Sequence, residues 1–184
     1  MKYIQRAHVE SARAYALEYF RADPNEYDLI FTANASAALK LVGEAYPFTA
    51  GSRFLLTFDN HNSVNGIREF AASRGAHVQY LPVMLPEMRA DENMLLSFLD
   101  TAVQGENNLF AYPAQSNFSS VKHPLDWIEK AHARGWDVLL DAAAFAPSNP
   151  LDLSIWKPDF VPLSFYKMFG YPTGMGALIA RRKT

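Results

Sequence analysis

Cysteine is absent from the 184-residue sequence. Within this chain there can therefore be no disulfide bond, no thiolate zinc site and no cysteine nucleophile. No second histidine or carboxylate stands near His61 at a metal-ligand spacing such as HExxH, so we expect no metal site. Any chemistry must depend on other side chains.

Long apolar runs and charge of one sign are also lacking. No run approaches the roughly 18 to 20 apolar residues of a membrane span, and residues 1–6 are not followed by the apolar core of a signal peptide. The formal net charge is -2, and Lys and Arg are scattered among Asp and Glu. We therefore expect a cytoplasmic protein with neither nucleic acid nor a membrane as a partner.

The composition is that of a globular domain, with 49% hydrophobic and 20% charged residues. Short apolar runs alternate with helical patterns, which indicates an α/β fold with right-handed crossovers and a mostly parallel sheet. The predicted strands are 29–32, 54–58, 77–83, 108–112, 136–140, 160–163 and 177–180. The predicted helices are 7–20, 36–45, 63–73, 91–103 and 124–134. Pro162 argues against a central ladder position for its strand.

Ligands of such sheets bind beyond the carboxyl ends of the strands, so the turns after strands are the places to search. Those turns hold 34–36, 59–62, 115–117, 141–144 and 164–167.

Asp141 ends a buried strand and is followed by three alanines. A carboxylate in such apolar surroundings needs a partner, and a protonated ring nitrogen would meet that need through a charge-assisted hydrogen bond. A helix cap or a loop hydrogen bond is the alternative.

Lys167 stands among apolar and aromatic residues, between Ser164-Phe165-Tyr166 and Met168-Phe169-Gly170. A lysine that attacks an aldehyde must be uncharged, and burial favours the uncharged amine. Most lysines near apolar residues simply extend their charge to water, and this alternative stays open.

Two other turns carry polar groups. Asn34, Ala35 and Ser36 open a helix whose amides could approach a phosphate, and Asn34 tolerates a left-handed turn, although ordinary helix capping is the alternative. Neither a Walker nor a Rossmann glycine pattern is present. His61 could stack on an aromatic cofactor or shuttle a proton, or it could be a capping histidine at the surface.

These pieces, in this order, resemble a known family. Residues 158–178, PDFVPLSFYKMFGYPTGMGAL, look like the lysine segment of the class V aminotransferases almost throughout. DNHNSV at 59–64, YPAQSNFS at 112–119 and DAAA at 141–144 precede it in the family's order. This family of fold type I pyridoxal phosphate (PLP) enzymes includes cysteine desulfurases, and the likeness is greatest to the amino-terminal domain of molybdenum cofactor sulfurases.

The resemblance spans nearly the whole chain and implies a three-layer α-β-α sandwich with a mostly parallel mixed sheet. Residues 1–184 would form one PLP-binding large domain, and the family is usually homodimeric. The resemblance implies that Lys167 forms a Schiff base with PLP, that Asp141 pairs with the pyridine nitrogen and that His61 stacks on the ring.

The resemblance also implies cofactor contacts outside the catalytic groups. Ser36, the amides beside Ala35, and Ser164 would hold the phosphate, and Asn117 would contact the ring hydroxyl. Two positions depart from the family. Tyr166 stands where desulfurases commonly have histidine, and Ala144 stands where many relatives have a glutamine or histidine that bonds the ring oxygen, which leaves Asn117 as the main contact to that oxygen.

Family members are longer and carry a carboxy-terminal small domain, so we expect a fragment, a truncated product or a degenerate relative. The persulfide-forming cysteine and the arginine that holds the substrate carboxylate lie in that further part of desulfurases.

The leading hypothesis is a PLP-dependent transferase or lyase that acts on a small amino acid. The alternative is a truncated, non-catalytic relative that keeps the fold and acts only as a binding module. A flavodoxin-like nucleotide binder also fits the alternation, but it explains neither the Lys167 segment nor the polar turn at Gln115-Ser116-Asn117.

Overall fold

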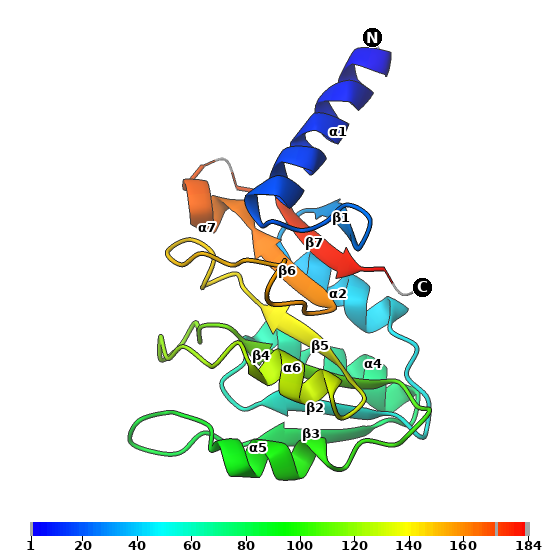
Figure 1. Ribbon diagram of the computed structural model, residues 1–184, viewed down its shortest axis with the longest axis vertical. Helices are drawn as coiled ribbons and strands as arrows, with labels where there is room; N and C mark the ends of the chain where they lie inside the picture. Colours follow the sequence, from blue (N-terminus) through cyan, green and yellow to red (C-terminus); the bar gives the residue numbers. More distant parts are fainter. Residues whose placement is uncertain (1, 172, 183–184) are drawn as a thin grey trace.

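The computed structural model describes residues 2–171 and 173–182, with side chains from Arg6 onward. Its centre is a sheet of seven strands in the order β1-β7-β6-β5-β4-β2-β3 (Figure 1). The strands are β1 (Tyr27–Thr32), β2 (Arg53–Thr57), β3 (His77–Leu81), β4 (Asn108–Pro113), β5 (Trp136–Asp141), β6 (Phe160–Ser164) and β7 (Gly176–Arg181). The helices are α1 (Lys2–Tyr19), α2 (Ala35–Ala45), α3 (Asn62–Asn65), α4 (Ile67–Ser73), α5 (Glu92–Leu99), α6 (Trp127–His132) and α7 (Phe165–Phe169).

Strand direction decides where the functional turns lie. β7 is antiparallel to both of its neighbours, β1 and β6, whereas the remaining neighbours in the sheet pair in parallel. β1 therefore runs in the same direction as β6, β5, β4, β2 and β3. The carboxyl ends of these six strands share one edge of the sheet, and the turns that follow them gather there.

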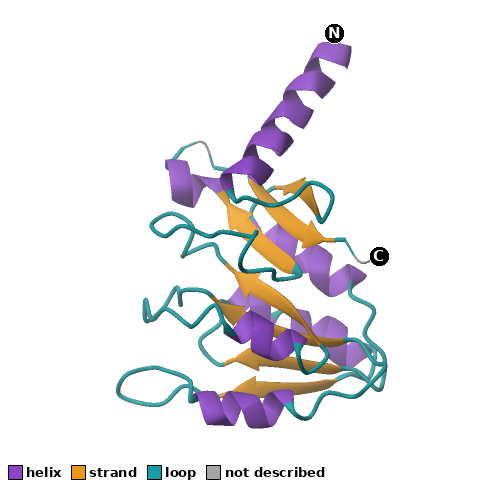
Figure 2. Cartoon of the chain, in the orientation of Figure 1, coloured by secondary structure: helices purple, strands orange, loops and turns teal. Residues whose placement is uncertain are grey.

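Helices cover both faces of the sheet and produce two separate cores (Figure 2). On one face, α5 and α6 contribute Leu95, Leu99 and Trp127 to a cluster that also holds Phe110 of β4. On the other face, α2, α3 and α4 pack their apolar side chains on the alternate residues of the same strands, such as Phe54. The expected three-layer α/β fold with a mostly parallel mixed sheet is confirmed.

Several predicted element boundaries were wrong for local reasons. The helix predicted at 63–73 is divided at Gly66, which is the C-cap of α3 and the N-cap of α4. The helices predicted at 91–103 and 124–134 are shorter, because turns replace their ends. Helix α7 was not predicted, since residues 164–167 were expected to be a turn.

Pro162 lies in β6, which is a central strand despite the proline. It pairs with Leu178 across the antiparallel ladder to β7. The ladder between β6 and β5 is correspondingly short, with Leu139 opposite Phe160. A proline has no N–H to donate, and Pro162 lies two residues beyond Phe160, the residue of β6 that pairs with β5.

Gly176 allows the backbone at the start of β7 to approach the turn before α2. A Cβ at this position would lie 2.6 Å from the Cα of Asn34 and would also meet the carbonyl oxygen of Leu163. We expect Gly176→Ala to destabilise the protein by about 1 to 3 kcal/mol, since backbone atoms must move to admit the methyl group. Thermal unfolding measures the effect at about 2 to 4 °C per kcal/mol, and an unchanged melting temperature would contradict this packing.

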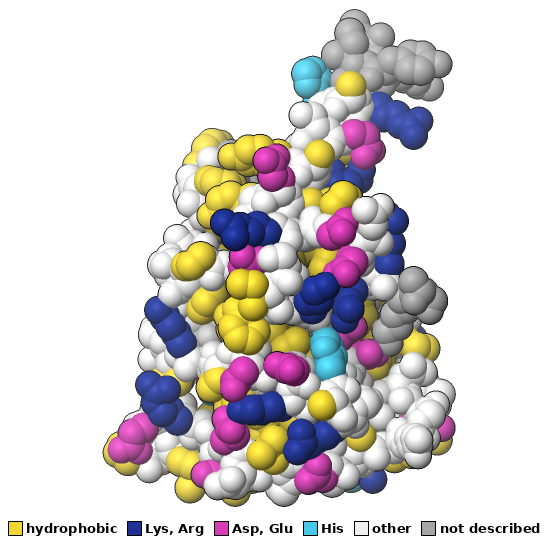
Figure 3. Space-filling view, in the orientation of Figure 1, with side chains coloured by type: hydrophobic (Ala, Val, Ile, Leu, Met, Phe, Trp, Pro, Cys, Tyr) yellow, Lys and Arg dark blue, Asp and Glu magenta, His cyan; other side chains and the backbone are white. Residues whose placement is uncertain are grey.

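The surface carries charges of both signs. In the view of Figure 3, basic and acidic side chains alternate over the face without a large patch of one sign. Among the described residues, no helix is both long and apolar enough to cross a membrane.

Candidate active site

Five turns at the carboxyl edge of the sheet meet around one pocket. They follow β1, β2, β4, β5 and β6, and the pocket is bounded by residues from each of them. All seven residues expected at the site line it, and these are Ala35, Ser36, His61, Asn117, Asp141, Ser164 and Lys167. The structure thus brings together side chains that are up to 132 positions apart in the sequence, between Ala35 and Lys167.

Asp141 is the last residue of β5 and is 7% exposed. Its Oδ1 accepts a hydrogen bond from the Ala143 N–H at 3.0 Å, so the loop hydrogen bond weighed as an alternative is present. Burial raises the pKa of Asp141, against the lowering effects of the Ala143 N–H and of the nearby charges of Lys167 and His61. The carboxyl group therefore lacks enough positive partners to offset its desolvation.

Lys167 lies on α7 and points its amine into the pocket. Its Nζ donates to Oδ1 of Asn117 at 3.1 Å. Burial and extension to water were the two alternatives for this amine, and the structure shows an intermediate case, since the Lys167 side chain is partly buried. Helix formation explains this, because Phe165 and Phe169 of α7 face an apolar groove against α1 while Lys167 faces the pocket.

The first turn of α2 forms one end of the pocket. The Ala35 N–H donates to Oγ of Ser164 at 2.9 Å, and Ser36 lies exposed beside it. Asn34 is the N-cap, and its side chain accepts from the Ala37 N–H. Its φ of -176° is extended, so Asn34 does not use the left-handed turn that asparagine tolerates, and the alternative of ordinary helix capping is confirmed.

His61 is both a capping residue and part of the pocket wall. Its Nδ1 accepts from the Ser63 N–H at 3.2 Å at the start of α3. In the neutral ring this places the remaining proton on Nε2. The capping interaction therefore orients the imidazole rather than competing with a role in the pocket.

Ser63 is a pocket residue that sequence reasoning missed. Its Oγ lies 2.6 Å from Oγ of Ser36 and 3.0 Å from Nδ1 of His61. It links the α2 end of the pocket to the imidazole. A serine two positions after a capping histidine is an ordinary pattern in sequence, so only the contact across 27 residues reveals its place.

Gln115, Ala144 and Tyr166 complete the wall in the neighbourhood of Asn117. The Oε1 of Gln115 accepts from Nδ2 of Asn149 at 3.3 Å, which orients the amide along the loop. Ala144 contributes no polar group, whereas Gln115, Asn117 and Tyr166 each bring a neutral polar group to the pocket lining.

The pocket combines an amine, a carboxyl group and an imidazole with the open end of a helix that favours an anion. The sheet of this strand order, with helices on both faces, has the fold type I architecture, and Lys167 lies on the helix after β6. The chain belongs to the class V aminotransferase family, whose model matches residues 4–184.

Curated relatives are similar over almost the whole of this chain. Molybdenum cofactor sulfurase from Bos taurus is 42% identical over an aligned length of 195 positions, and the match covers 95% of this chain and 21% of the relative. The protein of the same name from Arabidopsis thaliana is 40% identical over an aligned length of 205 positions, and the match covers 94% of this chain and 25% of the relative. The chain thus spans about a quarter of the length of these relatives.

Solved structures share the fold. A cysteine desulfurase from Escherichia coli superposes with a TM-score of 0.81 at 23% identity, over 95% of this chain and 43% of that chain. A cystine C-S lyase in complex with its reaction product, cysteine persulfide, gives a TM-score of 0.80 at 24% identity, over 97% of this chain and 47% of that chain.

Proposed function

We propose that this protein binds pyridoxal phosphate through Lys167 and uses it to transform a small amino acid. The observation that carries the proposal is that Asp141 and Lys167 face one pocket from adjacent strand ends. They are close enough for the lysine charge to lower the pKa of the carboxyl group, against the larger raising effect of burial. An aromatic ring held between them would meet an anion at one edge and an amine at another.

Asp141 fits a pyridine nitrogen. A buried carboxylate with a single local hydrogen bond is costly, and a protonated ring nitrogen would supply both a donor and a positive charge. Burial is the main cause of the raised pKa of Asp141, and a protonated ring nitrogen beside the carboxyl group would oppose that effect.

The α2 end of the pocket fits a phosphate. This helix has 11 residues, and Ala35, Ser36 and Ser164 line the same pocket at its amino-terminal end. Ser164 accepts from the Ala35 N–H, which leaves its own proton available to an anion. Backbone donors and the helix dipole add to the attraction for negative charge.

His61 and Asn117 would define the face and the oxygen-bearing edge of the ring. With Nδ1 occupied by the Ser63 N–H, the flat imidazole is oriented for stacking. Asn117 holds the Lys167 amine at 3.1 Å and would donate its Nδ2 to a ring oxygen. The same amide therefore places the nucleophile and recognises the ring.

When bound, pyridoxal phosphate supplies an electron sink for charge that develops on the substrate carbon. The residues of this chain would hold the ring, exclude water from the edge of the ring that faces the buried Asp141, and move a proton. The Nζ of Lys167 is the group placed to take that proton and return it.

Sulfur chemistry is the variant that the relatives suggest, since their names are molybdenum cofactor sulfurase and cysteine desulfurase. This chain has no cysteine to accept a sulfur atom. We therefore propose an amino-acid substrate and assign no sulfur transfer to the residues of this chain.

Titration of the purified protein with pyridoxal phosphate tests the proposal. We expect a visible absorbance band from lysine-bound cofactor, and reduction with borohydride should fix the cofactor on the peptide that contains Lys167, which mass spectrometry identifies. A well-folded protein that shows neither result would contradict the proposal and favour a binding module without catalysis.

A further inference from the structure

A buried acid–base pair lies behind the pocket, outside its wall. Nε2 of His123 lies 2.9 Å from Oδ2 of Asp59, and the two side chains are 2% and 0% exposed. Asp59 comes two residues before His61, whereas His123 ends the loop that contains Asn117. The pair therefore joins the two turns that supply the expected ring-facing groups.

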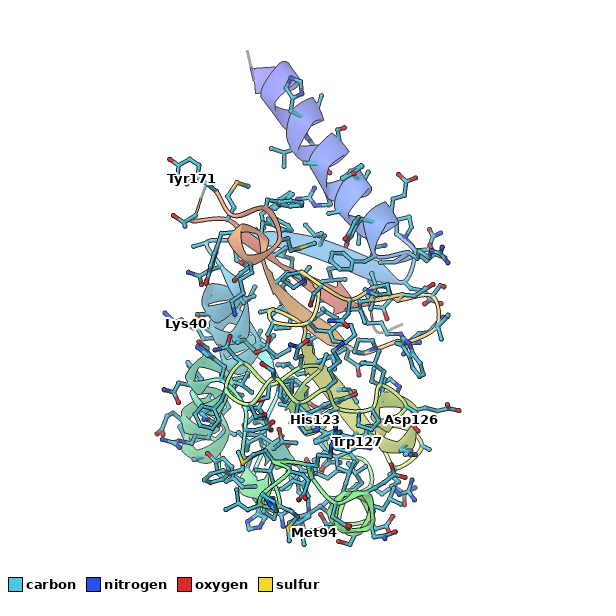
Figure 4. The ribbon with its side chains drawn as sticks, turned by 90° about the vertical axis from the view of Figure 1, so that its left-hand side faces the viewer. Lys40, Met94, His123, Asp126, Trp127 and Tyr171 are labelled. Carbon is cyan, nitrogen blue, oxygen red and sulfur yellow. The ribbon has the colours of Figure 1, made fainter. Side chains whose placement is uncertain are left out.

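Aromatic side chains hold the His123 imidazole in place. Its ring centroid lies 5.2 Å from that of Trp127 at an interplanar angle of 32°, and 6.4 Å from that of Tyr112 at 80°. Figure 4 shows His123 beside Trp127. The His123 N–H donates to the carbonyl oxygen of Ala114, so the base of the loop is also fixed. The imidazole is therefore held in one orientation toward the carboxyl group of Asp59.

A second contact ties the same two turns together. Oγ of Ser116 donates to the carbonyl oxygen of Asp59 at 3.3 Å. The Ser116 N–H in turn donates to the carbonyl oxygen of Val121 across the loop. Asp59 is therefore bound to the Asn117 loop through both its side chain and its backbone.

Stability alone is a poor reason for this pair. Burial raises the pKa of Asp59, but the side chains of His123, Thr57 and Ser116 together lower it by more. Burying two titratable groups still carries a desolvation cost, and apolar side chains of similar volume are often at least as stable. Such a desolvation cost is tolerated at a functional site where two loops must be held in a fixed relative position.

We infer that Asp59 and His123 are positioning residues that hold His61 and Asn117 at the separation an aromatic cofactor requires. This inference rests on the proposed function for the identity of the ring. The mechanical part, that the pair couples the turn at 58–63 to the loop at 114–121, does not depend on the cofactor.

Three variants test it. His123→Phe keeps an aromatic ring against Trp127 but removes the donor to Asp59, and His123→Gln restores a donor near the position of Nε2. His132→Gln is the matched control, because Nε2 of His132 makes a similar contact of 2.8 Å with Asp159 and neither residue lines the pocket. Thermal unfolding reports which variants remain folded.

In the cofactor-free protein we expect His123→Phe to accelerate hydrogen exchange in 58–63 and 114–121 together, whereas His132→Gln leaves both segments unchanged. For pyridoxal phosphate we expect about tenfold weaker binding in His123→Phe, the lower end of what loss of an outer partner costs at ligand sites, and recovery in His123→Gln. Exchange that rises in only one segment, or wild-type affinity in folded His123→Phe, would overturn the inference.

Failure of the proposed function is recognised separately. If wild-type protein does not bind the cofactor, the proposed function fails, and the exchange measurement still decides whether the pair couples the two turns. If wild-type protein binds and His123→Phe binds equally well, only the positioning inference fails.

Discussion

Lys167→Ala is expected to lose covalent attachment of pyridoxal phosphate completely. The amine of Lys167 faces the pocket and lies 3.1 Å from Asn117 Oδ1. Alanine has no nucleophile, so the visible band of lysine-bound cofactor and the borohydride-stable adduct should both disappear. The fold should tolerate the change, because the side chain is only half-buried and its recorded hydrogen bond is to an exposed amide.

Lys40→Ala is the matched control for this prediction. Lys40 is also on a helix, but it is exposed on α2 and pairs with Glu44 at 3.6 Å, outside the pocket wall. We expect the adduct to form on Lys167 in this variant as in the wild type. An adduct of equal yield in Lys167→Ala would show that another amine reacts and would remove Lys167 from the proposed mechanism.

Asp141→Asn is expected to weaken cofactor binding and to stabilise the cofactor-free protein. The amide keeps an oxygen for the Ala143 N–H but has no negative charge with which to stabilise a protonated ring nitrogen. A hydrogen bond to a charged group is worth about 1.5 to 3 kcal/mol, so the affinity should fall by about 10- to 150-fold. Equilibrium titration followed by absorbance or fluorescence measures the loss.

The stabilising effect of Asp141→Asn should depend on pH. Burial raises the folded-state pKa of Asp141 above its ordinary value of 3.8, so the folded state binds more protons than the unfolded state between the two values. Wild-type stability therefore falls as the pH rises through that window, and the asparagine variant does not share the loss.

The melting temperature of Asp141→Asn should accordingly exceed that of the wild type at neutral pH, and the gap should narrow as the pH falls toward 3.8. Each kcal/mol corresponds to about 2 to 4 °C in a domain of this size. A variant that is less stable than the wild type at neutral pH, or that binds the cofactor with wild-type affinity, would contradict the proposed role of Asp141.

Local sequence predicted strands better than helices. The core strands are continuous apolar runs such as Phe54-Leu55-Leu56. Such runs are typical of parallel strands, because helices cover both faces of a parallel sheet. Short helices depend on how the chain packs, as Gly66 and α7 show. A five-residue helix such as α7 is too short for a periodic signal, and it depends on tertiary contacts in which Phe165 and Met168 pack, partly buried, against the core.

The sequence predicted which residues belong to the site, but it did not predict which of them contact one another. Asp141 and Lys167 follow recognisable strands, so their placement at one edge follows from the direction of the parallel strands. The half-exposed environment of Lys167 did not follow, because apolar neighbours in sequence lie on another side of a helix. Ser63 and the Asp59–His123 pair also escaped detection, since their contacts join segments 27 and 64 residues apart.

By itself, the sequence determined the α/β class, the family and the turns that carry polar groups, because these depend on local periodicity and on ordered motifs. Only the tertiary structure decided which groups touch, how much water each retains and which pKa values move. The reason is physical: desolvation and hydrogen bonding depend on distances between atoms from different segments, and those distances exist only once the sheet has assembled.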